Sequence, residues 1–360
     1  MRTLAPALLI LAFLAAPAAA QIDPSTALLE KSGWEALNAG NFRAAAEAFR
    51  AAIGADSKNA RLHLGAGAAA YLERRDEDAT RALDRALELD PRLTEARILL
   101  GQLRYRDGDL FGAIGLYERI LADTPTDTRS RDTLDRWRRE AELHDRLRQS
   151  LNDRFTVSFE GPAEAPLAAQ ALESLDRAYW RIAQALSAYP TKPVSVVLYT
   201  AEQFHDITRS PAWAAGAYDG TIRVPLRGAL ENPKELDRVL AHEFTHALIH
   251  TLAARNVPTW LNEGVAAAFE SDDLKWAEER VRKAPQPMPL DVLRTSFGRF
   301  SGGQAQLAYA TSALAVRLLL DEVGGLGIAN LLRDLGAGVD FDAAFAYRIQ
   351  RSFPDWTASR

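Results

Sequence analysis

The chain has 360 residues, a formal net charge of −5 at pH 7 and no cysteine. Its length allows two ordinary domains with separate hydrophobic cores. The net negative charge gives no general attraction to nucleic acid or to an anionic membrane, so we expect neither as a partner. The lack of cysteine excludes disulfides and a lipidated cysteine anchor.

The first twenty residues have the features of a secretory signal peptide. Arg2 is followed by an apolar run over residues 4–14, and small residues at 18–20 precede Gln21. Because the run is too short for a comfortable membrane span, we predict a signal peptide over 1–20 and a periplasmic or secreted protein. An uncleaved N-terminal anchor is the alternative. We expect no transmembrane segment in the mature chain.

Three copies of a 34-residue unit follow over residues 21–128. Small residues recur 34 positions apart at two places in the unit: Gly33, Gly67 and Gly101, and Ala45, Ala79 and Ala113. A large apolar residue lies four positions after each alanine: Phe49, Leu83 and Tyr117. This period is typical of a helix-turn-helix pair, in which the small residues allow close packing and the large one fills the gap.

The pattern resembles tetratricopeptide repeats, whose arrays curve into a concave surface that commonly holds a protein partner. We therefore predict a protein partner on the concave surface. A role as a spacer or as a lid on the neighbouring domain is the alternative. The next segment, residues 129–154, is predicted to be a capping and linker helix, because acidic residues precede basic ones by four positions, as in Asp132 with Arg136.

The second domain, residues 155–360, is predicted to open with a strand, a helix and a strand. Residues 155–159 alternate in polarity, residues 165–189 have the spacing of an amphipathic helix, and residues 193–199 form a buried apolar run. The Asp219-Gly220 pair between extended segments indicates a hairpin. Helices are expected later in the domain over 272–283, 304–323, 328–335 and 341–349.

The helix that carries the chemistry is predicted to begin at Pro233. Asn232 precedes it as the N-cap residue, and Glu235 is placed to complete a capping box. Apolar residues give the helix a broad surface to bury: Leu236, Val239, Leu240, Phe244, Ala247 and Leu248. A rigid core helix is the support that a catalytic site needs.

His242 and His246 are four residues apart on this helix, so both imidazoles can bind one divalent metal ion. Glu243 lies out of step with the pair, where its carboxylate is placed to hold the attacking water as general base. Catalytic zinc sites typically use three protein ligands and leave one position for water. Glu263, which follows the helix breaker Pro258, can supply the third ligand. We therefore predict Zn²⁺ bound by His242, His246 and Glu263.

Two neighbours of this set receive different roles. His250 continues the four-residue spacing, but it lies about 12 Å along the helix from His242 and cannot share the same ion. We expect it to be structural or to support a metal ligand without binding the metal. Asn262 is expected to orient the water or a metal ligand without binding the metal itself.

The string HEFTH, followed after sixteen residues by Glu263 in PTWLNEGVA, resembles the gluzincin metallopeptidases, the HExxH…E clan. With the stretch YATS that begins at Tyr309, it is most similar to peptidase MA-like domains joined to tetratricopeptide repeats. The resemblance implies a mainly α protein with an α+β part: a helical solenoid, then a domain with a small mixed sheet, an active-site helix and a helical C-terminal half. It also implies an edge strand beside the active-site helix, where an extended substrate could bind.

In this family a tyrosine or histidine from the downstream half donates a hydrogen bond to the oxyanion, which makes Tyr309 the candidate here. Packing as a half-buried helix aromatic is the alternative for Tyr309. The predicted function is therefore an exported zinc metallopeptidase that hydrolyses a peptide or protein substrate. The sequence contains no GAMEN-like segment of the kind expected in zinc aminopeptidases, which favours an endopeptidase. The alternative is an envelope interaction scaffold with a weakly active or inactive peptidase-like domain.

Overall fold

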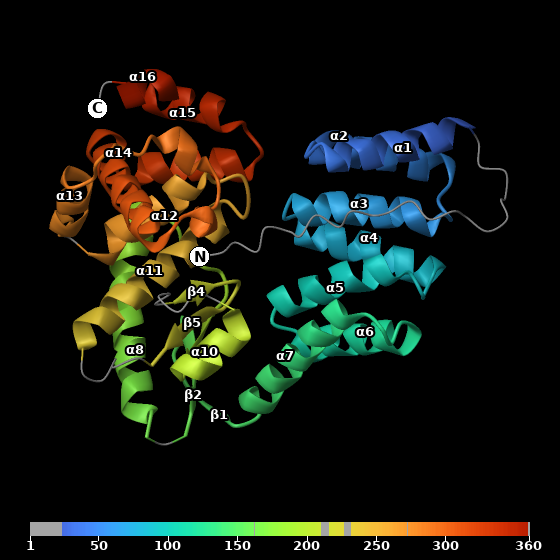
Figure 1. The fold of residues 1–360 in the computed structure, drawn as a ribbon, viewed down its shortest axis with the longest axis horizontal. Coiled ribbons are helices and arrows are strands. Elements are labelled where there is room, and N and C mark those ends of the chain that lie inside the picture. Colours follow the sequence, from blue (N-terminus) through green and yellow to red (C-terminus); the bar gives the residue numbers. More distant parts are fainter. Residues whose placement is uncertain (1–23, 162, 210–215, 227–231, 272, 359–360) are drawn as a thin grey trace. The chain divides into compact units, whose positions relative to one another are not determined.

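The computed structural model describes residues 24–161, 163–209, 216–226, 232–271 and 273–358. They form two compact units that divide at Leu143 (Figure 1). The predicted signal peptide, 1–20, lies outside the described residues. Within the described part, no helix has both the length and the apolar run needed to cross a membrane.

The first unit is a stack of helices in which each helix packs against its neighbours in the sequence (Figure 1). Its six paired helices are α1 (Pro24–Asn38), α2 (Phe42–Ala55), α3 (Ala60–Leu72), α4 (Asp76–Leu89), α5 (Thr94–Arg106) and α6 (Leu110–Asp123). A seventh helix, α7 (Thr128–His144), follows the last pair and covers its apolar face with Leu134 and Trp137.

The repeated small residues are where helices come closest, as their spacing predicts. A Cβ atom at Gly33 would lie 2.8 Å from the ring of Phe49, and one at Gly67 would lie 2.7 Å from Leu83 Cγ. Gly101 stands in the same relation to Tyr117, at 2.7 Å. All three repeats therefore use one packing solution, in which a large side chain fills the space above a glycine.

The second unit contains a five-stranded sheet in the order β1-β2-β3-β5-β4. Its strands are β1 (Leu147–Leu151), β2 (Phe155–Glu160), β3 (Val194–Tyr199), β4 (Ala217–Tyr218) and β5 (Ile222–Pro225). The pairs β2–β3 and β3–β5 are parallel, whereas both edge strands pair antiparallel. The Asp219-Gly220 hairpin is confirmed, because it joins β4 to β5.

The predicted linker helix over 129–154 is wrong in its second half. The helix ends at His144, and β1 pairs with β2 from Leu147 opposite Glu160 to Leu151 opposite Thr156. Leu147 and Leu151 are four residues apart, a spacing that fits a helix face as well as a strand. Backbone hydrogen bonds with β2 favour the strand over the helix. The sequence of residues 147–151 alone does not predict this pairing.

Helices surround this sheet and make up most of the second unit. Those before the helix of His242 and His246 are α8 (Ala165–Ala178), the π-helical segment η1 (Tyr179–Ala183), α9 (Gln184–Leu186) and α10 (Ala201–Thr208). Next come α11 (Pro233–Leu252), α12 (Thr259–Glu270) and α13 (Lys275–Arg282), then the 3₁₀ turns η2 (Leu290–Arg294) and η3 (Phe297–Arg299). The chain ends with α14 (Gly302–Gly336), α15 (Phe341–Ile349) and α16 (Phe353–Ala358).

Three of the predicted C-terminal helices differ from the structure. The helix predicted over 272–283 begins at Lys275. The helices predicted over 304–323 and 328–335 form one element, α14, which is interrupted at Gly324, where φ is 66°. Glycine tolerates this positive φ, so the helix kinks at Gly324 and continues on the other side of it.

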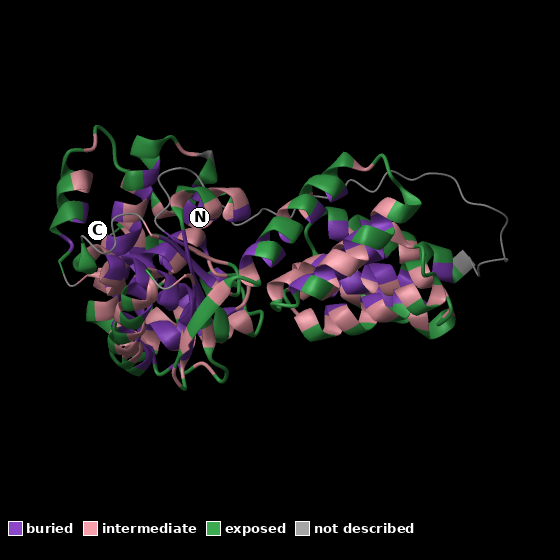
Figure 2. Cartoon of the chain, turned by 90° about the horizontal axis from the view of Figure 1, so that it is seen from below, coloured by how far each residue is buried: buried purple, intermediate pink, exposed green. Residues whose placement is uncertain are grey.

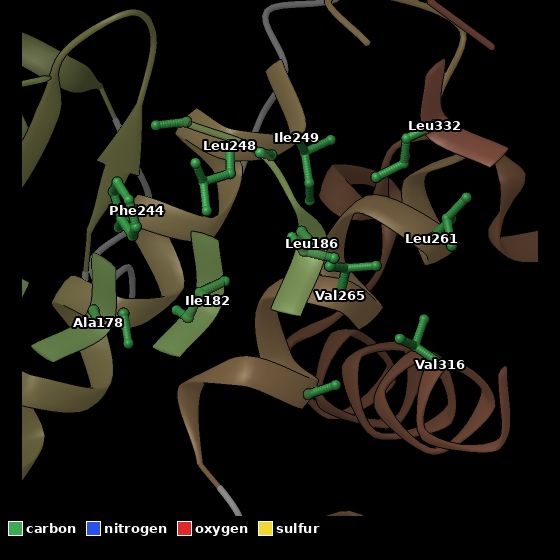
Figure 3. Close-up of a cluster of buried hydrophobic side chains, with 14 of the residues drawn as sticks. Ala178, Ile182, Leu186, Phe244, Leu248, Ile249, Leu261, Val265, Val316 and Leu332 are labelled. Carbon is green, nitrogen blue, oxygen red and sulfur yellow. The ribbon is translucent and has the colours of Figure 1, made fainter. Parts of the chain in front are cut away.

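The core of the second unit lies between α8, α11, α12 and α14, and buried residues gather there and on the sheet (Figure 2). Phe244, Leu248 and Ile249 of α11 form part of one continuous apolar cluster (Figure 3). Leu261 and Val265 of α12 belong to the same cluster, as do Val316 and Leu332 of α14. The helix that carries the two histidines is therefore fixed by its own apolar face.

Leu83→Ala tests the repeat packing. Leu83 is fully buried above Gly67, so we expect its truncation to lower the free energy of unfolding by about 2–5 kcal/mol. The measurement is urea unfolding followed by circular dichroism. Leu28 is 68% exposed, and Leu28→Ala serves as the control with an effect within about 0.5 kcal/mol. Equal effects of the two substitutions would contradict the assignment.

Candidate metal centre

Helix α11 begins as its sequence predicts, but its cap is only half of a capping box. The Asn232 side chain accepts a hydrogen bond from the backbone N–H of Glu235. The Glu235 carboxylate does not return to the cap. It binds Arg238 instead, with contacts of 2.6 and 2.9 Å. A charged partner one turn away competes successfully with the backbone N–H, because a bidentate guanidinium contact is the stronger of the two.

Helix α12 reaches α11 because Gly264 lets it pack closely on α14. A Cβ atom at Gly264 would lie 2.5 Å from the carbonyl oxygen of Ser312 and 2.6 Å from a methyl group of Val316. Any larger residue would push α12 away from α14. The preceding residue, Glu263, is thereby held at a fixed position facing the two histidines of α11.

Three donor atoms converge at this point: His242 Nε2, His246 Nε2 and Glu263 Oε2. The two nitrogens are 3.2 Å apart, and the carboxylate oxygen lies 3.7 Å from His242 and 3.6 Å from His246. Donors in a tetrahedral zinc site with bonds of 2.0–2.1 Å are about 3.4 Å from one another. Among the described residues, this is the one group of three or more histidine, cysteine, aspartate or glutamate side chains whose ligand atoms lie close enough together to bind one metal ion.

Two carboxylate oxygens at the centre have no hydrogen-bond partner among the described residues. They are Glu263 Oε2 and Glu243 Oε2, on side chains that are 2% and 4% exposed. A buried carboxylate without a partner is costly, so this site requires a cation or an ordered water for both groups. The residues present therefore fit a bound divalent metal ion.

The electrostatics of the pocket favour a cation as well. Burial alone would lower the pKa of His242, but the nearby carboxylate of Glu263 and the hydrogen bond with Glu270 raise that pKa to about 10. Burial would raise the pKa of Glu263, yet the charge of His246 and the closeness of both imidazoles hold it below its usual value. Without a metal the pocket thus retains a proton at neutral pH, and a metal ion would replace that proton.

Glu243 differs from Glu263 although both are buried. Burial raises the pKa of Glu243, and the two histidines oppose that shift only in part. Such a carboxylate accepts a proton more readily than a solvated one. This is the property that a general base needs, and its free oxygen can receive the proton.

The other nitrogen of each histidine is held by an acceptor. His242 Nδ1 lies 2.7 Å from Glu270 Oε2, and His246 Nδ1 lies 3.2 Å from Asn262 Oδ1. These contacts fix the ring orientation and leave each Nε2 lone pair for a metal. The predicted orienting role of Asn262 therefore has a geometric basis, on His246.

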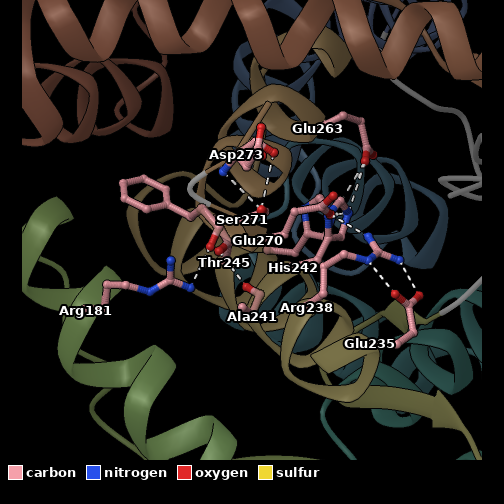
Figure 4. A network of polar contacts seen from close by, with 12 residues as sticks. Arg181, Glu235, Arg238, Ala241, His242, Thr245, Glu263, Glu270, Ser271 and Asp273 are labelled. Atoms are coloured by element: carbon pink, nitrogen blue, oxygen red, sulfur yellow. Dashed lines mark hydrogen bonds and ion pairs between the residues drawn. The ribbon is translucent and has the colours of Figure 1, made fainter. Parts of the chain in front are cut away.

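Glu270 was not predicted from the sequence. It is the last residue of α12 and lies seven positions, or two helical turns, after Glu263, so both face α11. That spacing was the signal that could have found it. Glu270 also forms an ion pair with Arg238, at 2.9 Å (Figure 4). Burial would raise the pKa of Glu270, but the contacts with His242 and Arg238 lower it.

Tyr309 lies close enough to the carboxylates of the site for their charges to affect the pKa of its phenol. Burial raises its pKa well above the usual value, and the charges of Glu263, Glu243 and Glu270 raise it further. The phenol therefore keeps its proton and can donate a hydrogen bond. Its ring also packs edge-on against Phe297, with ring centroids 5.4 Å apart. Both roles considered for Tyr309, donor and packing aromatic, are compatible with this position.

The edge strand β4 passes beside the general-base candidate. A Cβ atom at Gly216, the residue before β4, would lie 2.7 Å from the Cγ and Oε1 atoms of Glu243. Two residues later, the ring of Tyr218 contacts that of His250, with centroids 5.9 Å apart. The strand therefore runs along α11 in the direction of the helix. His250 meets the strand and does not join the donor set, as its spacing predicts.

Comparison with known families agrees with this architecture. A model of the Peptidase MA superfamily matches residues 174–351. A tetratricopeptide repeat model matches residues 31–92 and 77–128. The chain thus carries a Peptidase MA superfamily domain preceded by tetratricopeptide repeats. It is a peptidase-like protein with a protein-interaction module.

Solved structures similar to the chain include the first tetratricopeptide repeat domain of Spaghetti (RPAP3) bound to an HSP90 peptide and the protein MamA. The first has 20% identity, covers 33% of this chain and 96% of its own, and gives a TM-score of 0.32. MamA has 24% identity, covers 34% and 72% of the two chains, and gives a TM-score of 0.32. Comparison with curated proteins gives no match.

Gly264→Ala tests whether the packing of α12 positions the donor set. The added methyl would meet the Ser312 carbonyl, so we expect a loss of about 1–3 kcal/mol in unfolding free energy and weaker metal binding. The measurements are thermal unfolding and zinc titration. Gly302→Ala is the control, because a Cβ atom there meets nothing within 4 Å. Unchanged stability and metal affinity in Gly264→Ala would refute the packing argument.

Proposed function

We propose that this protein is an exported, zinc-dependent peptidase of the gluzincin type that cleaves peptide bonds within protein substrates. The observation that carries the proposal is the convergence of His242, His246 and Glu263 beside a buried Glu243 with a free oxygen. Three ligands leave room for water in a tetrahedral site, which distinguishes a catalytic zinc site from a closed structural one.

Each residue of the site has a role in hydrolysis. A bound zinc ion would supply a Lewis acid and bring the pKa of a water molecule near 7. Glu243 holds the attacking water, takes its proton and delivers that proton to the leaving amine. Tyr309 donates a hydrogen bond to the oxygen on which negative charge develops. Glu270 and Asn262 keep the two imidazoles in their metal-binding orientation.

The edge strand supports an extended peptide as substrate. On β4 the side away from β5 can accept the backbone of a peptide by strand addition, and Gly216, the residue before β4, lies against Glu243. An extended chain that passes the site suits cleavage within a protein. The repeats would recruit the substrate or the protein complex that contains it.

Glu243→Gln and Glu263→Ala separate catalysis from metal binding. We expect Glu243→Gln to keep zinc and to lose at least about 100-fold in the rate of cleavage of an unfolded protein, because the proton acceptor is removed. Glu263→Ala should lose zinc, because only the two imidazoles remain. Zinc content is measured by elemental analysis and cleavage by electrophoresis.

Glu279→Gln is the control, since Glu279 is exposed on α13 and pairs with Lys283. It should match the parent chain in both measurements. If Glu243→Gln cleaved as fast as the parent, the general-base assignment would fail. If the parent bound zinc and cleaved nothing, the domain would be a peptidase-like scaffold.

Zinc affinity should depend on pH with a definite sign. The pKa of His242 is raised to about 10 without metal, so zinc must displace its proton at any lower pH. Between pH 6 and 8 we expect the affinity to increase by about tenfold per pH unit for one displaced proton. Competition with a chelator of known pH dependence measures this. A pH-independent affinity over that range would contradict it.

A further inference from the structure

Arg238 takes part in none of the steps above, yet it lies one helical turn before His242 on α11. Its guanidinium binds both oxygens of Glu235, at 2.6 and 2.9 Å, which fixes the plane of the group. The remaining guanidinium nitrogen of Arg238, Nη1, lies 2.9 Å from Glu270 Oε2. Figure 4 shows Arg238 between Glu235 on one side and the His242–Glu270 contact on the other.

One oxygen of Glu270 receives both neighbours. Oε2 is 2.7 Å from His242 Nδ1 and 2.9 Å from Arg238 Nη1, and the Glu270 side chain is 7% exposed. A carboxylate has no proton to donate, so the hydrogen in the short contact belongs to His242 Nδ1. His242 Nε2 is therefore the nitrogen that would bind a metal, once the metal displaces the proton that the ring carries in the metal-free protein.

The backbone around Glu270 is held by other arginines. Arg181 donates to the carbonyl of Phe269 at 2.8 Å, and Arg317 donates to the carbonyl of Ala268 at 3.2 Å. These are carbonyls of the last turn of α12, which lack partners within the helix. The end of α12 is therefore fixed, and what stays adjustable is the Glu270 side chain itself.

Glu270 shares the site with two other carboxylates, those of Glu243 and Glu263, and all three act on Tyr309. Like charges in a buried site repel, so a third carboxylate needs its own cation to remain in place. Arg238 supplies that cation on the side remote from the donor set. Without it, no cation would hold the Glu270 carboxylate against His242.

We propose that Arg238 is a positioning residue for the metal ligand His242, acting through Glu270, whose carboxylate it holds against the His242 ring. The inference rests on the proposed function, because it concerns the same donor set. Glu235 in turn holds Arg238. The chain of contacts therefore starts at Glu235 in the first turn of α11, passes through Arg238 and Glu270 of α12, and returns to α11 at His242. The ion pair joins the two helices that carry the metal ligands.

The test compares zinc affinity in Arg238→Met, Glu270→Gln and the double variant, by competition with a chelator. Methionine keeps the length of the apolar part of the side chain and removes the charge. We expect each single variant to bind zinc about 10–100-fold more weakly. The double variant should bind no more weakly than Glu270→Gln, because Arg238 acts through Glu270. Arg238→Lys should recover part of the loss, since it restores the cation but not the fork.

A matched control and a spectrum separate positioning from general stability. Arg177 pairs with Asp237, next to Arg238, at 2.8 Å on the exposed side, so Arg177→Met should leave zinc affinity unchanged. Thermal unfolding of each variant checks that it folds. With cobalt in place of zinc, the visible absorption of Arg238→Met should shift, because the metal environment changes, while that of Arg177→Met should not.

Two results would overturn the inference: unchanged zinc affinity in Arg238→Met, or losses that add in full in the double variant. Failure of the proposed function would look different. A parent chain that binds zinc and depends on Arg238 for it, but cleaves no peptide bond, would support the inference and refute the peptidase assignment. A parent chain without zinc affinity would refute both.

Discussion

The metal centre depends on how closely α12 can approach α14. Gly264 brings the two helices together until a Cβ atom would touch the Ser312 carbonyl, and this contact fixes Glu263 opposite His242 and His246. The apolar cluster that includes Phe244 and Val265 holds α11 and α12 in the same core. The donor set is therefore a consequence of helix packing, and no loop has to be ordered to create it.

This helix packing brings three carboxylates close together, and their negative charge must be balanced. Glu243, Glu263 and Glu270 come together in a buried region, and two of their oxygens have no partner among the described residues. On one side Arg238 offsets Glu270, and at the centre a metal ion would offset the other two. The same arrangement separates the two carboxylates: despite burial, the histidines hold the pKa of Glu263 below its usual value, whereas burial raises the pKa of Glu243.

The repeats obey a simpler rule. Phe49, Leu83 and Tyr117 each fill the space above a glycine in the preceding helix, and the spacing of 34 residues returns that contact in each unit. Every contact is local in the sequence, which explains why periodicity was sufficient to predict these helix pairs. The same periodicity contains no information about the partner that such a surface would hold.

The sequence by itself determined the repeats, the start of α11 at Pro233, the hairpin at Gly220 and the choice of His242, His246 and Glu263 as the candidate donors. Each depends on residues that are close in the chain or follow a fixed spacing. The strand β1, the contact between Arg238 and Glu270 and the approach of Gly216 to Glu243 came only from the tertiary structure. In each of these a local pattern was compatible with two outcomes, or silent. The outcome in each case depended on a partner outside the local segment, because hydrogen bonds and ion pairs form with the groups that the fold brings near.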